Sequence, residues 1–212
     1  MNHKTECIIL RKIPFREKSL IVNTFTRDCG RIDLMLKGSR NISAKSFPSA
    51  ELFRVFSLEF IQKTSSGNNS DIFSPKVMEY SGNFDRIALY TQNYLSRCEY
   101  ASFLLKHTAP FLVLPETFDS LLVLLERLTD NGDHSFDITS SKLVFLDESG
   151  LLPEDAGKSV ENNALLQQIL AYARNGGMEK PLMTPQYEKR LTEWVKALCR
   201  YHGLGSFTCS KE

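Results

Sequence analysis

The sequence concentrates its cationic side chains, which could bind phosphate, near the N-terminus. Residues 1–45 contain 10 lysines and arginines against 4 aspartates and glutamates, whereas residues 81–212 contain 13 against 17. Guanidinium and ammonium groups in such excess are typical of surfaces that bind polyanions. The charge therefore predicts a basic N-terminal part with a polyanionic partner. The alternative is a solvated surface that happens to be basic.

Motifs for catalysis are missing or incomplete. Lys37-Gly38-Ser39 lacks the upstream glycine spacing of a P-loop, and neither G-x-G-x-x-G nor G-x-S-x-G occurs. The acidic pairs Asp147-Glu148 and Glu154-Asp155 flank an expected helix end, where we interpret them as caps. Cys29 lies near two arginines, but no histidine is close to it in the sequence, so we interpret it as a hairpin residue. We therefore expect no enzyme activity.

Histidines and cysteines do not form a metal-binding pattern. The 4 histidines are scattered, and the 5 cysteines show no paired spacing, which is typical of free thiols in a reducing compartment. No stretch approaches the roughly 18 apolar residues of a membrane span, and the short apolar run before Arg11 is unlike a signal peptide. We therefore expect a cytoplasmic protein without a metal or other cofactor.

The first 80 residues have the period-2 pattern of β-strands. Between residues 31 and 37, Ile32, Leu34 and Leu36 alternate with Arg31, Asp33, Met35 and Lys37, so we expect the first set to be buried. The expected strands span residues 6–12, 20–26, 31–37, 52–61 and 71–79. Five strands of this length are typical of a small closed barrel, which leaves no exposed edge.

After Gly82 the apolar residues recur at steps of three and four, as on one face of a helix. The expected helices run from residue 84 to near Pro110, and over residues 115–128, 135–148, 160–174 and 184–201. The fold class is therefore α+β with two domains, a β-barrel followed by an all-α part. Hydrophobic residues at 42% and charged residues at 24% agree with an ordinary globular protein.

Several N-terminal motifs together resemble one family. They are Ile8-Ile9-Leu10-Arg11, Pro14-Phe15-x-Glu17-x-Ser19-Leu20-Ile21-Val22, Phe25-Thr26-Arg27-x-x-Gly30-Arg31-Ile32-x-Leu34 and Lys37-Gly38-x-Arg40. Their order and spacing resemble the bacterial recombination mediators of the RecO family. The resemblance covers residues 5–62 and continues more loosely along the helical part.

The resemblance implies a five-stranded OB-fold barrel over residues 1–80 and an α-helical domain over residues 81–212. It also implies a non-enzymatic mediator of RecF-pathway DNA repair, associated with the nucleoid. Such a protein binds single- and double-stranded DNA and anneals complementary strands. With its partner RecR it helps to load RecA onto DNA coated with single-stranded-DNA-binding protein, whose acidic C-terminal tail it binds.

The sequence departs from many members of the family at one site. Those members carry a four-cysteine zinc site just after a Leu-Leu-Pro sequence, which stands here at residues 151–153. Residues 153–197 contain no cysteine. Because an all-cysteine zinc site needs four thiolates, we expect no zinc.

An OB barrel holds single strands with a basic groove and with aromatic faces on which bases stack. Arg31 and Lys37 are expected on the solvent face of the third strand, and Gly38 allows a close approach of the backbone to a phosphate. Phe15 and Phe47 are candidates for base stacking, with packing in the barrel as the alternative. The predicted DNA-binding residues are Arg31, Lys37, Arg40, Arg27, Lys45, Arg11, Arg16, Lys18 and Gly38.

The partner's tail would need an apolar groove with cations on its rim. The candidate cations on the helices are Arg127, Lys142 and Arg86. An alternative function for the whole chain is an OB-fold adaptor that binds RNA or another protein without annealing strands, because the OB fold alone does not determine the ligand.

Overall fold

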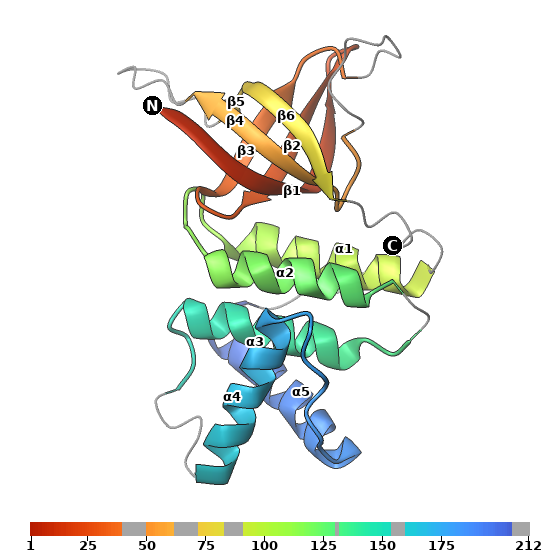
Figure 1. The fold of residues 1–212 in the computed structure, drawn as a ribbon, viewed down its shortest axis with the longest axis vertical. Helices are drawn as coiled ribbons and strands as arrows, with labels where there is room; N and C mark the ends of the chain where they lie inside the picture. Colours follow the sequence, from red (N-terminus) through yellow and green to blue (C-terminus); the bar gives the residue numbers. More distant parts are fainter. Residues whose placement is uncertain (40–49, 62–71, 83–90, 130–131, 154–159, 205–212) are drawn as a thin grey trace. The chain divides into compact units, whose positions relative to one another are not determined.

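The computed structural model describes residues 1–39, 50–61, 72–82, 91–129, 132–153 and 160–204 (Figure 1). The chain forms two compact units. Unit 1 comprises Met1–Ala88 and Leu104–Pro115, and unit 2 comprises Leu89–Phe103 and Glu116–Glu212. Strands in the first unit and helices in the second confirm the α+β layout with two parts. The domain boundary near residue 80 stays a prediction, and residues 104–115 group with the strands.

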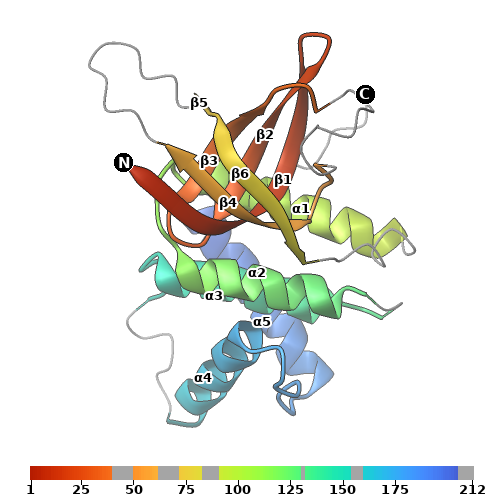
Figure 2. The ribbon, with the colours of Figure 1, turned by 45° about the horizontal axis from the view of Figure 1, so that its top comes forward.

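Unit 1 is built on one curled sheet. Its strands are β1 (Asn2–Phe15), β2 (Ser19–Thr26), β3 (Gly30–Leu36), β4 (Val55–Ile61), β5 (Ile72–Phe73) and β6 (Pro75–Gly82). They lie side by side in the order β5-β3-β2-β1-β4-β6. The two outermost strands, β5 and β6, are separated in the chain by Ser74 alone, so the sheet must curl until its ends approach each other (Figure 2).

The prediction of five strands is wrong, because the described sheet has six. The predicted fifth strand, residues 71–79, is divided at Ser74. Its first part, β5, pairs in parallel with β3, and its second part, β6, pairs antiparallel with β4. Pro75, which begins β6, has no N–H to donate, and the register shifts where it pairs with Phe60. The strand therefore divides where the chain changes neighbours.

The predicted alternation in β3 is confirmed. Ile32, Leu34 and Leu36 are buried in the core of unit 1, and the residues between them are only partly buried. In β4, Phe56, Leu58 and Phe60 are buried on the same core. A one-residue slip in either strand would turn this apolar set to the outside, so the core fixes the register.

Residues 108–113, which we call the edge segment, lie against the open edge of β3. Pro110 forms a parallel bridge with Arg31, and the Phe111 N–H donates to the Arg31 carbonyl at 3.2 Å. Gly30 has φ +67°, and a Cβ there would overlap the backbone of Leu112. Only glycine therefore lets the edge segment come this close to β3.

We predict that Gly30→Ala destabilises unit 1 more than Gly38→Ala does. Both glycines have positive φ, but a Cβ at Gly38 would have no atom within 4 Å. Gly38→Ala should therefore lower the free energy of unfolding only by the strain of an alanine in the left-handed region, about 1 kcal/mol. Gly30→Ala adds a backbone clash and should cost about 2–4 kcal/mol. Urea unfolding of the two variants measures the difference, and equal losses would show that the edge segment does not pack on β3.

The helices are α1 (Thr91–His107), α2 (Pro115–Arg127), α3 (Ser135–Glu148), α4 (Val160–Arg174) and α5 (Pro185–Tyr201). The predicted bounds of α3 and α4 are confirmed, and those of α2 and α5 differ by one residue. The predicted start of the first helix, from residue 84, lies outside the described residues, which resume at Thr91. Of the helices described, none combines the length and apolar character needed to cross a membrane.

A buried arginine joins α1 to the C-terminal end of α2 within unit 2. Arg97 is 1% exposed, and its Nη2 donates to the carbonyls of Leu125 at 3.0 Å and Leu128 at 2.7 Å. Burial lowers the pKa of its guanidinium. The contact places a cation at the negative end of the α2 dipole, where the last carbonyls need donors.

The other end of α2 is capped by a carboxylate from α3. Glu148 accepts from the N–H of Glu116 at 2.9 Å and from the N–H and hydroxyl of Thr117 at 2.7 and 2.6 Å. Asp147 forms an ion pair with Arg174 at 2.6 Å. Glu148 therefore caps a helix, but that helix is α2 and not the one whose end the acidic pair flanks. Glu154 and Asp155 lie outside the described residues.

We predict that Glu148→Ala lowers the free energy of unfolding by about 1–2 kcal/mol, because the first N–H groups of α2 lose their acceptor. Glu179→Ala, which removes an exposed carboxylate, is the control and should stay within about 0.5 kcal/mol of the parent. Urea titration followed by circular dichroism measures both. Equal effects of the two substitutions would contradict the capping role.

Candidate nucleic-acid interface

Three exposed cations meet at one end of the sheet of unit 1. Arg16 and Lys18 stand in the turn between β1 and β2, and Lys37 directly follows β3. Because Leu20 pairs with Leu36, the start of β2 and the end of β3 lie side by side. We call Arg16, Lys18 and Lys37 the basic end. The antiparallel register thus joins cations from two separate turns, as a phosphate-binding surface requires.

Local backbone geometry shapes the two turns. Gly38 has φ +74° and open space around its Cα, and the Ser39 hydroxyl donates to the Leu36 carbonyl at 3.0 Å. Arg16 has φ +53°, and its guanidinium carbon lies 5.3 Å from the centroid of the Phe15 ring. One face of Phe15 is therefore associated with a cation, and base stacking on this ring stays a prediction.

The outer face of β1, β2 and β3 carries two rows of side chains that run across the strands. An apolar row and a polar row follow from the pairing register: Ile13, Ile21 and Met35, then Arg11, Asn23 and Asp33. Arg11 is exposed, and the Asn23 amide donates to the Asp33 carboxylate at 2.6 Å. The face therefore offers apolar surface and one further cation, while Asp33 reduces its positive charge.

Two predicted DNA-binding arginines lie toward the other end of β3, where their side chains have contacts within unit 1. The Arg31 guanidinium donates to the Leu105 carbonyl, and that of Arg27 lies 3.7 Å from the Glu6 carboxylate. The structure does not bring these two residues to the basic end. Arg40, Lys45 and Phe47 lie outside the described residues.

Two of the three cations proposed for the partner's tail, Arg127 and Lys142, are engaged inside unit 2. Arg127 lies 3.5 Å from the centroid of the Tyr172 ring and donates to the Tyr172 carbonyl at 2.8 Å. Lys142 forms an ion pair with Glu99 at 3.0 Å. Arg86 lies outside the described residues. The structure therefore does not bring Arg127 and Lys142 together on the rim of a groove.

A surface hollow lies between the starts of α3 and α5, where the sequence predicted no site. Phe136 and Pro185 line it, together with Lys189 and Lys196. Glu188 and Glu193 line it as well, so its two lysines are balanced by two carboxylates. The alternation of charge along α5 could have revealed this side of the helix from the sequence.

The structure brings a histidine close to Cys29, which sequence distance did not reveal. The Cys29 sulfur lies 3.7 Å from Nδ1 of His3. Burial and the Asp28 carboxylate raise the pKa of the Cys29 thiol, so the pair does not form an activated nucleophile. Among the residues that the structure describes, no cluster of three or more acidic, histidine or cysteine side chains could hold a metal ion.

The family model described as "Recombination protein O N terminal" matches residues 1–70. The DNA repair protein RecO of Thermodesulfovibrio yellowstonii is 33% identical over 78 residues, which are 35% of this chain and 31% of that protein. The RecO of Chlorobium phaeobacteroides is 45% identical over 42 residues, or 20% of this chain and 16% of the relative. The RecO of Rhodopirellula baltica is 39% identical over 56 residues, or 26% and 21%.

Each match thus spans less than a third of the relative's length. These matches agree with the resemblance to RecO that the motifs in residues 5–62 indicate. That resemblance is confirmed, since residues 1–70 match the model of the RecO N-terminal part.

Proposed function

We propose that this protein binds DNA through unit 1 and acts in recombinational DNA repair. The observation that carries the proposal is the basic end, where Arg16, Lys18 and Lys37 meet on a unit whose sequence matches the RecO N-terminal model. The relatives carry the name DNA repair protein, which supports the same role. The protein would act by binding, in the cytoplasm at the nucleoid, and not by catalysis.

The sheet topology supports an OB fold for unit 1. β1 pairs with both β2 and β4, while β5 pairs with β3 and β6 pairs with β4, so a single strand divided at Ser74 closes the sheet. OB folds bind oligonucleotides on the face of strands 2 and 3 and on the adjoining loops. Here that face has an apolar row for bases, and the basic end adjoins it.

Affinity in this proposal is mainly electrostatic. Each cation that neutralises a phosphate of a single strand releases a counterion. Each such contact contributes about 0.7 to the magnitude of the salt slope. Arg11 and the basic end together give a slope of log K against log salt of about −3. Sequence preference should be small, since phosphate contacts and stacking do not recognise base edges.

Mediator activity would follow from the same charge. Two complementary strands repel each other through their phosphates, and a cationic surface that holds both lowers this repulsion. We therefore propose strand annealing, with RecR as the partner for loading RecA on DNA coated with single-stranded-DNA-binding protein. Recognition of that protein's acidic tail belongs to the proposal, without Arg127 or Lys142 as its assigned ligands.

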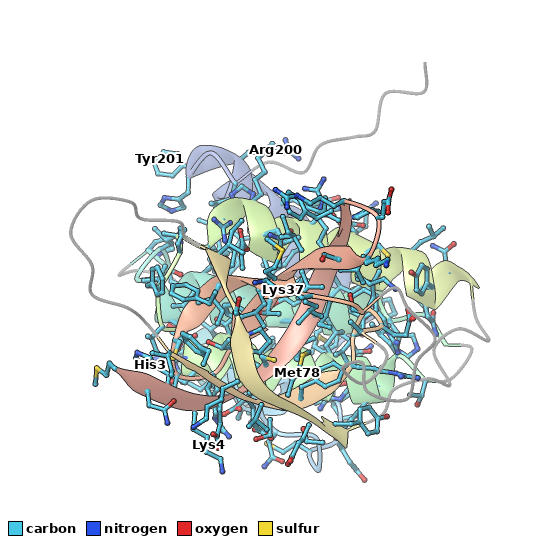
Figure 3. The ribbon with its side chains drawn as sticks, turned by 90° about the horizontal axis from the view of Figure 1, so that it is seen from above. His3, Lys4, Lys37, Met78, Arg200 and Tyr201 are labelled. Atoms are coloured by element: carbon cyan, nitrogen blue, oxygen red, sulfur yellow. The ribbon has the colours of Figure 1, made fainter. Side chains whose placement is uncertain are left out.

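We predict that Lys18→Gln with Lys37→Gln reduces the salt slope on single-stranded DNA by about 1.4, because two phosphate contacts are lost. Lys4→Gln with Lys76→Gln removes the same charge from the same unit and is the control. Lys4 lies 3.6 Å from Glu59, and Figure 3 shows it well away from Lys37. Fluorescence anisotropy of a labelled oligonucleotide at several salt concentrations gives both slopes.

Equal slopes for the two double variants would refute the basic end as the DNA site. Competition with an RNA of the same sequence separates the two functions considered for the barrel. Preferential displacement of DNA by RNA would favour the RNA-binding adaptor over the repair mediator.

We predict that the protein accelerates annealing of complementary oligonucleotides coated with single-stranded-DNA-binding protein, and that the acceleration fades with salt. The Lys18→Gln/Lys37→Gln variant should lose most of it, whereas the Lys4→Gln/Lys76→Gln variant should keep it. The rate is followed as quenching of a fluorophore on one strand by a quencher on its complement. An unaccelerated rate with intact DNA binding would remove annealing from the proposed function.

A further inference from the structure

The edge segment exposes three consecutive apolar side chains on unit 1. Phe111, Leu112 and Val113 are 40%, 42% and 47% exposed. Single exposed apolar residues are ordinary on protein surfaces, but contiguous ones mark binding sites more often. An aromatic ring among them can bind another flat ring by stacking.

Phe111 is held in an unusual conformation. Its φ is +63°, a region that bulky residues rarely occupy. The Phe111 N–H donates to the Arg31 carbonyl at 3.2 Å, and its ring packs edge-on against Phe73 with centroids 5.8 Å apart. Strained backbone of this kind persists only where several contacts impose it, and it clusters at ligand sites. The ring is therefore presented to solvent from a fixed base.

The stretch of chain that carries this ring has no acidic residue. Residues 104–115 contain Lys106 and His107 but no carboxylate. A phosphate chain approaching Phe111 along this segment would thus meet no repelling group from it. A protein partner with an acidic or neutral surface would meet the same charge. The position of Phe111 along the sheet must therefore decide between a nucleic-acid strand and a protein as the ligand.

The position of Phe111 matches the path of a single strand along β3. The edge segment pairs at Arg31, near the start of β3, whereas Lys37 follows its end. The 7 residues of β3 extend about 20 Å, at about 3.3 Å per residue. A single strand, which can extend beyond the roughly 3.4 Å per nucleotide of a duplex strand, covers that length with at most about six nucleotides. An OB fold typically binds about 4–16 nucleotides.

We infer that Phe111 is a stacking platform for one base of a single strand whose phosphates lie at the basic end. The inference rests on the proposed function and adds to it a non-electrostatic contact at the far end of β3. It also predicts a minimum length, since a strand must reach from Lys37 to Phe111 to use both.

Phe111→Ala should weaken binding of a 12-nucleotide oligo-dT about tenfold, in the range for loss of one stacked base. The salt slope should not change, because phenylalanine carries no charge. Binding of a 2-nucleotide oligo-dT, too short to reach from Lys37 to Phe111, should be unaffected. Leu182→Ala, which removes an apolar side chain that is 99% exposed on unit 2, is the matched control and should bind both as the parent does.

A fluorescence measurement keeps the inference testable if Phe111→Ala is poorly folded. Phe111→Trp on a Trp194→Phe background places the chain's one indole at the platform. Saturating 12-nucleotide oligo-dT should quench its emission, and the 2-nucleotide strand should not.

Parent-like affinity of Phe111→Ala, or no quenching of the new indole at saturation, would overturn the inference while the parent's salt slope still supports the basic end. Failure of the parent protein to bind DNA at all would instead overturn the proposed function. Sedimentation velocity tests the alternative that the edge segment mediates contacts between copies of the chain. A change of oligomeric state in Phe111→Ala with unchanged DNA binding would assign the segment to contacts between copies of the chain.

Discussion

The free edge of β3 is the constraint on which unit 1 depends. An unpaired edge exposes a row of N–H and C=O groups that would pair with any other strand. Here the edge is shared, since β5 pairs with Asp33 and Leu34 while the edge segment bridges Arg31. The pairing of β5 with β3 requires the strand to be interrupted at Ser74 before β6 pairs with β4. The bridge at Arg31 requires Gly30, because any Cβ would meet the Leu112 backbone.

The covered edge also decides which cations remain available. Covering the start of β3 draws the Arg31 guanidinium to the Leu105 carbonyl. The opposite end of β3 has no such cover among the described residues, and Lys37 is exposed there beside the turn that carries Lys18. Strand position alone would have made Arg31 and Lys37 equivalent, since both alternate with the buried leucines. Their difference arises from a segment about 75 residues further along the chain.

Patterns that depend on near neighbours could be predicted from the sequence, and contacts between distant residues could not. The alternation in β3 and the bounds of α3 and α4 follow from local apolar periods, which the core enforces. No such period announces that Cys29 lies beside His3 or that Glu148 caps α2, because both contacts join separate elements. Arg97 shows the same limit, since a charged residue in a helical pattern is expected in solvent, and here two carbonyls at the end of α2 hold it in the core.

The two ends of β3 therefore offer different interactions along one strand, electrostatic at one end and apolar at the other. In the proposed function, the basic end would attract phosphates over a distance and without sequence preference, so it would govern the rate of encounter with DNA and the response to salt. The edge segment offers contact area that acts only at close range and without regard to salt. A mediator must hold single strands tightly enough to compete with a coating protein and loosely enough to release them for pairing. When affinity is divided between phosphate contacts that salt screens and an apolar contact that it does not, each contribution can change without the other.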